Sequence, residues 1–97
     1  MLDRLRPLSY PQSTVFVLCY SINSKDSFEY IDFLQEDVKR FEKNVPIILC
    51  ATKIDLRKTL TDNSQLISYE DGVEKAIKIK AHSFIEISTF TLEVKIF

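Results

Sequence analysis

Residues 45–55 read Val45-Pro46-Ile47-Ile48-Leu49-Cys50-Ala51-Thr52-Lys53-Ile54-Asp55. The residues up to Ala51 are apolar without polar alternation, a pattern typical of a strand that is buried on both faces of a parallel sheet. We expect this strand to run from about Pro46 to Ala51. A polar tetrapeptide beginning at Thr52 follows it directly. Ligands of open α/β sheets bind beyond the carboxyl ends of strands, so this tetrapeptide is a candidate binding loop.

The sequence before residue 45 predicts a strand followed by a helix. Residues 14–20 are mostly β-branched and aromatic, which again indicates a strand that is buried on both faces. Ser24 is a suitable N-cap for the helix. Apolar residues then recur at three- and four-residue steps and form one stripe: Phe28, Ile31, Leu34, Val38 and Phe41. Strand, helix and strand of these lengths predict a right-handed βαβ unit.

The sequence after residue 55 predicts a second unit of the same kind. Leu56 to Ile67 is a polar connection, and Ser68 is placed to cap a helix, with Asp71 in a capping-box-like position. The apolar side of that helix is expected to consist of Val73, Ala76 and Ile77. Residues 84–87 predict a third strand. In residues 92–97, apolar and charged side chains alternate, which favours a strand over a helix.

Ninety-seven residues with an apolar fraction of 45% predict one small globular domain, residues 1–97. We divide it into an irregular segment (1–13), a β-α-β-α-β core (14–91) and a tail stub (92–97). The net charge of −1 gives no field that would attract nucleic acid or an anionic membrane. No apolar run reaches the length of a membrane span, and His82 has no suitable metal partners nearby.

Cys19 and Cys50 each lie near the end of an apolar run. The expected state is two buried free thiols in a reducing compartment. A disulfide becomes possible if the two strands are neighbours. The sequence holds no C-x-x-C pair, so a zinc site is not expected.

The two polar loops that follow the second and third strands suit recognition of guanine. Guanine presents adjacent N1–H and N2–H₂ donors, which one carboxylate can accept together, and Asp55 is the candidate. The aliphatic stem of Lys53 is long enough to cover the face of the base. The backbone N–H of Thr89 can donate to O6, and the Ser88 hydroxyl can hold the Asp55 loop. Each motif taken alone has low specificity.

Residues 3–11, Asp-Arg-Leu-Arg-Pro-Leu-Ser-Tyr-Pro, resemble the second switch region of Rho-family small GTPases. The resemblance continues through residues 15–16, 27–29, 46–49, 52–57 and 84–89. It implies a partial P-loop NTPase-like (Ras-like) α/β fold with a three-stranded parallel sheet and two crossover helices. It also implies a GTP-driven switch in cytoskeletal signalling.

The resemblance assigns two groups of residues. Contacts to GTP or GDP would come from Thr52, Lys53, Asp55, Ser88, Thr89 and Phe90. Contacts to exchange factors, dissociation inhibitors or effectors would come from Arg4, Leu5, Arg6 and Leu8. Three positions depart from the family pattern: Leu2 for tyrosine, Ala51 for glycine, and Phe90 for a smaller residue.

Other parts of the family's machinery are not matched in this sequence. A G-x-x-x-x-G-K-[ST] phosphate loop needs two glycines, and the sequence has one, Gly72. The phosphate loop, the first switch, the Mg²⁺ ligands and the water-positioning glutamine all belong before Met1 in the family. The closing helix is a stub, and residues 93–97 contain no cysteine for prenylation, so we expect an unanchored cytoplasmic protein.

Three functions stay open for the isolated chain. It is a Rho-type GTPase family member that neither holds GTP tightly nor hydrolyses it. Alternatively, it is a non-enzymatic fragment that titrates Rho regulators through the second-switch-like segment, or a truncated product without function. The resemblance also leaves the strand at residues 14–20 as an apolar sheet edge and one sheet face open. We therefore expect a weakly stable or self-associating protein.

Overall fold

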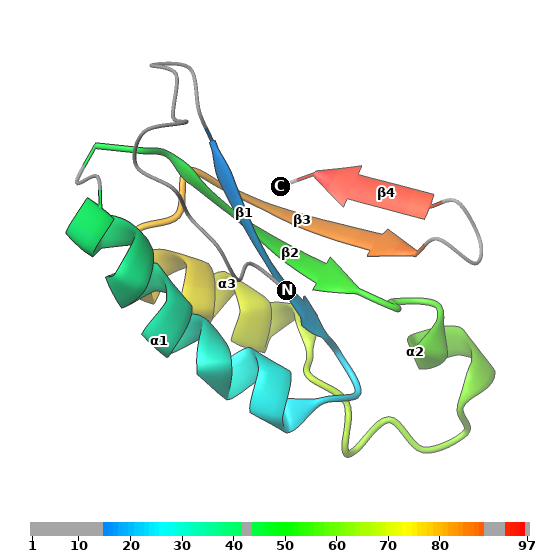
Figure 1. Ribbon diagram of the computed structural model, residues 1–97. Coiled ribbons are helices and arrows are strands. Elements are labelled where there is room, and N and C mark those ends of the chain that lie inside the picture. The colour runs from blue at the N-terminus through cyan, green and yellow to red at the C-terminus, as the bar shows by residue number, and fades with distance from the viewer. Residues whose placement is uncertain (1–14, 42–43, 89–92, 97) are drawn as a thin grey trace.

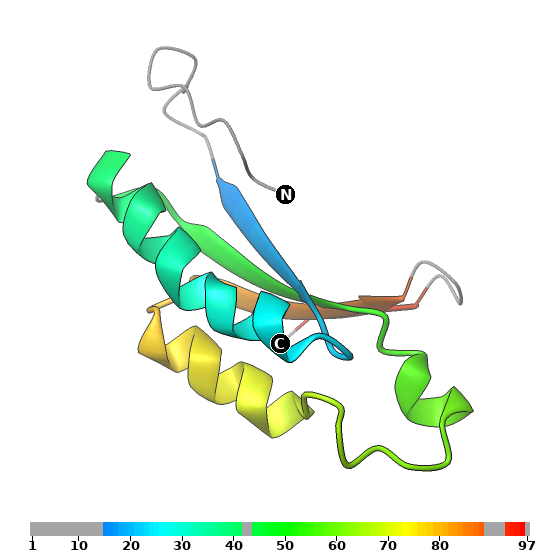
Figure 2. The same cartoon turned by 60° about the horizontal axis from the view of Figure 1, so that its bottom comes forward.

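The computed structural model describes residues 15–41, 44–88 and 93–96. Its elements are β1 (Phe16–Ser21), α1 (Lys25–Phe41), β2 (Ile47–Thr52), α2 (Leu56–Thr59), α3 (Tyr69–Lys78), β3 (Ser83–Ser88) and β4 (Glu93–Ile96). The strands form one sheet in the order β1-β2-β3-β4, and helices α1 and α3 cover the same face of it (Figures 1 and 2).

The pairing of the strands confirms the predicted three-stranded parallel sheet and adds a fourth strand to it. The structure also adds α2 within residues 56–67, which were predicted as a polar connection. β1 pairs with β2, and β2 with β3, in parallel, as a three-stranded parallel sheet requires. β4 then pairs antiparallel with β3, and Glu93 lies opposite Ser88. The alternation in the tail thus correctly predicted a strand. The sheet has four strands because this segment turns back along β3.

Strand β1 lies at the edge of the sheet, and its two faces differ. Phe16, Leu18 and Tyr20 are buried under the helices, whereas Val17 is 43% exposed and Cys19 is exposed. The prediction of a strand buried on both faces is therefore wrong for β1, as is the prediction that Cys19 is buried. The physical reason is that both packed helices lie on one side of the sheet (Figure 2).

Helix α1 packs on the sheet through the predicted apolar stripe. Ile31 and Val38 are buried, and Phe28 and Leu34 pack against the core while partly exposed. Phe41, the last residue of α1, departs from the prediction and is 44% exposed.

Helix α3 begins as predicted and packs against the core through two of the three predicted apolar residues, Val73 and Ala76. The Ser68 hydroxyl accepts a hydrogen bond from the backbone N–H of Asp71 at 3.0 Å, which is the expected N-cap. Gly72 and Lys75 are buried, whereas Ile77 is 71% exposed, contrary to prediction. Ile77 follows Ala76 by one residue, which rotates its side chain by about 100° away from the sheet.

A charged cluster joins the two helices. Lys75 Nζ lies 2.9 Å from Asp32 Oδ2, and Lys78 Nζ lies 3.2 Å from the same oxygen. Lys75 is 7% exposed, and its ammonium group also lies 4.4 Å from the centre of the Phe28 ring. The ring face and the carboxylate together compensate for burial of this cation.

Acid should weaken the contact between α1 and α3. Burial raises the pKa of Asp32, but the hydrogen bonds from Lys75 and Lys78 outweigh it and hold the pKa below its ordinary value of 3.8. A carboxyl group with a lowered pKa stabilises the fold above its unfolded-state pKa, and this contribution is lost as pH falls through the folded-state pKa.

We therefore expect Asp32→Asn to destabilise the protein at neutral pH. The difference from the wild type should shrink as pH falls from about 5 to about 2. Urea unfolding of both proteins across this range measures it. A difference that stays constant with pH would contradict the role given to the Asp32 carboxylate.

Candidate functional site

Thr52 ends β2 and fastens it to the end of β1. Its hydroxyl donates a hydrogen bond to the carbonyl of Tyr20 at 3.1 Å and lies 3.3 Å from the Ser21 hydroxyl. The backbone N–H of Ile22 donates to the carbonyl of Thr52 at 3.2 Å. The Thr52 side chain thus holds the loop that follows β2 in place.

Lys53 is the exposed residue of this loop. Its φ of 63° lies in the left-handed region, which is uncommon for a residue other than glycine. The next residue, Ile54, holds the loop down, because its side chain is 4% exposed and its N–H donates to the carbonyl of Ile87 at 3.3 Å. The Lys53 side chain is therefore held at the carboxyl end of the sheet and is accessible to a ligand.

Asp55 and Ser88 meet where β2 and β3 end. The Ser88 hydroxyl donates a hydrogen bond to Asp55 Oδ1 at 2.7 Å, so the hydrogen bond expected between the two loops is present. Asp55 is the N-cap residue of α2, but its side chain makes no capping bond to that helix. Ser88 is 2% exposed and Asp55 is half-buried. The carboxylate is thus fixed by a buried hydroxyl while its outer side stays accessible.

An ion pair next to the loop at residues 52–55 joins α2 to β3. Arg57, in α2, places Nη2 2.7 Å from Glu86 Oε2 in β3, and the same nitrogen donates to the carbonyl of Ile67 at 3.2 Å. Glu86 is 2% exposed. Sequence reasoning missed both residues, although a glutamate at a core-facing position of an apolar strand is a signal that a cation lies nearby.

The ion pair also influences the neighbouring tyrosine. Burial raises the pKa of the Tyr20 hydroxyl, and the negative charge of Glu86 raises it further. The raised pKa keeps the Tyr20 hydroxyl protonated at neutral pH.

Several predicted site residues lie outside the described residues. They are Thr89 and Phe90 of the second loop, and Arg4, Leu5, Arg6 and Leu8 of the second-switch-like segment. Their roles, and with them the alternative of a fragment that titrates Rho regulators, stay predictions.

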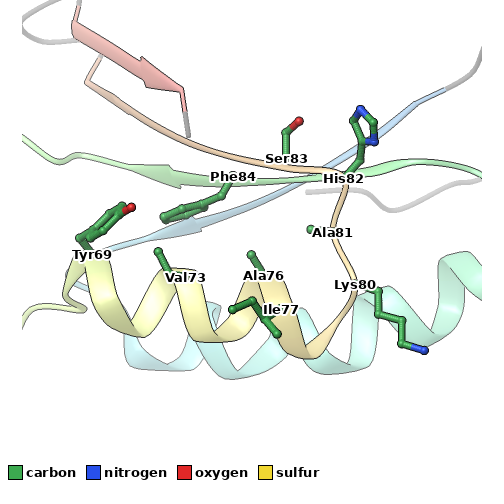
Figure 3. A pocket seen from close by; sticks show the side chains of 9 residues that line it. All are labelled: Tyr69, Val73, Ala76, Ile77, Lys80, Ala81, His82, Ser83 and Phe84. Carbon is green, nitrogen blue, oxygen red and sulfur yellow. The ribbon is translucent and has the colours of Figure 1, made fainter.

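A groove of about 280 Å³ lies elsewhere, between α3 and β3. Figure 3 shows Val73, Ala76 and Ile77 of the helix on one side of it and Phe84 of the strand on the other. The groove also includes Ser83, at the amino end of β3, whereas Ser88 stands at the carboxyl end. It is therefore separate from the candidate site.

Neither a metal cluster nor a membrane span is found in the described ranges 15–41, 44–88 and 93–96. Within them, no three His, Cys, Asp or Glu side chains lie close enough together to hold a metal ion. None of the helices there is both long and apolar enough to cross a bilayer.

Residues 2–94 match the Ras family. Curated relatives include the Rho-related GTP-binding protein RhoB of Homo sapiens, which is 41% identical over 99 residues, with 94% of this chain and 50% of RhoB covered. The Rho-related protein racN of Dictyostelium discoideum is 41% identical, with 87% of this chain and 40% of racN covered. The Ras-like GTP-binding protein RhoL of Drosophila melanogaster is 37% identical, with 89% and 45% covered.

The fold and the matched range define the class: the chain belongs to the Ras family, as a member of the small GTPases. Its curated relatives confirm the resemblance to the Rho-type members. The chain spans about half the length of these relatives, 50% in the case of RhoB. In the family, the nucleotide is a guanine nucleotide bound with Mg²⁺.

Proposed function

We propose that this chain recognises guanine in a GTP- and GDP-dependent signalling switch of the Rho type. The carboxylate of Asp55 accepts from the N1–H and N2–H₂ groups of the base, and the stem of Lys53 covers its face. The observation that carries this proposal is the 2.7 Å hydrogen bond that fixes Asp55 to Ser88 at the carboxyl ends of two neighbouring strands. The Thr89 N–H completes the site by donating to O6, and Thr52 and Phe90 flank it. Exchange factors, dissociation inhibitors and effectors of Rho GTPases are the proposed partners.

The proposed role of these residues is limited to the base. The one glycine of the sequence, Gly72, is buried in α3 and cannot serve a phosphate loop there. The described residues also do not bring together three carboxylate, histidine or cysteine side chains that could hold Mg²⁺. The described residues hold the Asp55 carboxylate through the Ser88 hydroxyl, and they leave the Lys53 side chain of the same loop exposed.

Base contacts alone should give weak binding. A bidentate contact discriminates the correct base from a wrong one by about 1–3 kcal/mol. Association costs at least about 4 kcal/mol in lost translational and rotational freedom. A polypeptide of these 97 residues should therefore bind a guanine nucleotide with a Kd of about 1 mM or weaker. We expect it not to hydrolyse GTP.

The test is a comparison of guanosine and adenosine monophosphate by NMR. We expect millimolar guanosine monophosphate to shift the amide signals of Lys53, Asp55 and Ser88, and adenosine monophosphate to leave them in place. Replacing Asp55 with alanine should weaken the guanine response by about tenfold, the equivalent of one lost base contact.

Asp62→Ala is the matched control. Asp62 is a fully exposed aspartate in the connection that follows Asp55, and its side chain accepts a hydrogen bond from the N–H of Ser64 at 2.9 Å. This variant should retain the response to guanosine monophosphate. Equal shifts with the two nucleotides, or a response that survives loss of the Asp55 carboxylate, would refute the proposed recognition.

A further inference from the structure

The two cysteines of the sequence, Cys19 and Cys50, lie directly opposite each other in the sheet. They are register partners on β1 and β2, which run parallel. Neighbouring strands lie about 4.7–4.9 Å apart, and disulfides join residues whose Cα atoms are about 4.4–6.8 Å apart. The sheet thus already places the two residues at a separation that a disulfide can span.

Both side chains lie on the sheet face that α1 and α3 do not cover. Leu18 and Tyr20, on either side of Cys19, are buried on the helix-covered face, so Cys19 points to the opposite face. Cys19 is exposed, whereas Cys50 is 2% exposed. Solvent and small reagents therefore reach Cys19 first.

The contact between the thiols makes them chemically unequal. A hydrogen bond from the Cys50 thiol lowers the pKa of Cys19 to about 7, although burial acts in the opposite direction. The same hydrogen bond, together with burial, raises the pKa of Cys50. Cys19 is thus an exposed and partly ionised nucleophile, with a protonated thiol held beside it.

We propose that Cys19 and Cys50 form a thiol modification site, in which Cys19 reacts with a small-molecule disulfide such as oxidised glutathione and Cys50 resolves the product into an intrachain disulfide. The arrangement carries the proposal: an accessible attacking sulfur, a shielded second sulfur, and a strand register that holds the two together. The site lies on the sheet face opposite α1 and α3 (Figure 2) and does not depend on the proposed recognition of guanine.

The reaction balances in two exchanges. The Cys19 thiolate bonds to one sulfur of oxidised glutathione, whose other half leaves as a thiolate and takes up a proton. Cys50 then loses its proton, and its sulfur attacks Cys19 Sγ and displaces the second glutathione. Bonding of Cys19 removes the negative charge that helped to raise the pKa of Cys50, so this second step becomes easier. Two protein thiols are oxidised and one glutathione disulfide is reduced.

The experiment uses the folded chain, oxidised glutathione, an acid quench and a thiol-blocking alkylating agent, with intact mass as the readout. The wild type should lose the mass of two hydrogen atoms, carry no alkyl group and remain monomeric on a non-reducing gel. Cys50→Ala should stop with one glutathionyl group on Cys19. In Cys19→Ser, the remaining buried thiol should stay unmodified until the protein is unfolded in guanidinium.

Each alternative product overturns the proposal. A wild type that stops at one glutathionyl group shows that Cys50 does not resolve it, and a disulfide-linked dimer shows that the partner sulfur is on another chain. An unreacted wild type shows that Cys19 is not a nucleophile for this class of reagent. The result for the wild type is decisive without the variants, so a variant that fails to fold leaves the test intact.

Discussion

Replacing Arg57 with methionine is expected to lower the free energy of unfolding by about 3 kcal/mol. The substitution removes the partner of Glu86, a carboxylate that is 2% exposed, and leaves it charged in the core. Breaking a buried pair on one side costs about 3–5 kcal/mol, and we take the lower end because the Arg57 side chain is 25% exposed. Urea unfolding of wild type and variant measures the effect.

The same substitution in an exposed pair provides the control. Arg40 lies 3.2 Å from Asp37 in α1, with side chains 71% and 44% exposed. Arg40→Met should change the free energy of unfolding by less than about 1 kcal/mol, since exposed pairs contribute little. Adding Glu86→Gln to the Arg57 variant should recover part of the loss, because a buried neutral amide costs less than a buried charge. Equal effects of the Arg57 and Arg40 substitutions would contradict the buried pair.

Gly72→Ala is expected to destabilise the protein by about 1–3 kcal/mol, even though alanine favours a helix by about 1 kcal/mol over glycine. A Cβ at position 72 would lie 2.4 Å from Cζ of Phe84 and 2.6 Å from the Tyr20 hydroxyl oxygen. Both rings belong to buried residues, so α3 would have to move away from the sheet. Thermal unfolding should show a lower Tm, by about 4–8 °C for each kcal/mol.

Substitutions at Glu74, an exposed residue of the same helix, measure helix propensity without a change in core packing. The Glu74→Ala variant should be more stable than the Glu74→Gly variant by about 1 kcal/mol. Alanine in place of glycine should thus stabilise the protein at position 74 and destabilise it at position 72. Phe84→Leu should relieve the overlap, so Gly72→Ala should cost less in that background. A stabilising Gly72→Ala in the wild-type background would show that α3 does not approach the sheet as closely as the structure indicates.

The candidate site was predictable to the extent that chain order determines it. Parallel strands bring their carboxyl ends to one edge of the sheet, so the loops that begin at Thr52 and Ser88 had to meet. The hydrogen bond between Asp55 and Ser88 follows from that placement. The ion pair of Arg57 and Glu86 could not be predicted in this way, because it joins α2 to a strand distant in sequence. The polar connection that contains Arg57 has no periodic pattern that would indicate which residue it contacts.

By itself, the sequence determined the order and type of the main strands and helices, the cap at Ser68 and the loop at residues 52–55, since these depend on local periodicity and on residues near in the chain. It predicted the buried stripe of α1, but it did not determine the buried side of β1 or the exposure of every residue of α3. The tertiary structure decided that Ile77 faces solvent, that Gly72 meets Phe84, and that Cys19 lies exposed beside Cys50. The physical reason is that burial depends on the surface that each element packs against. Here both packed helices lie on one face of the sheet (Figure 2).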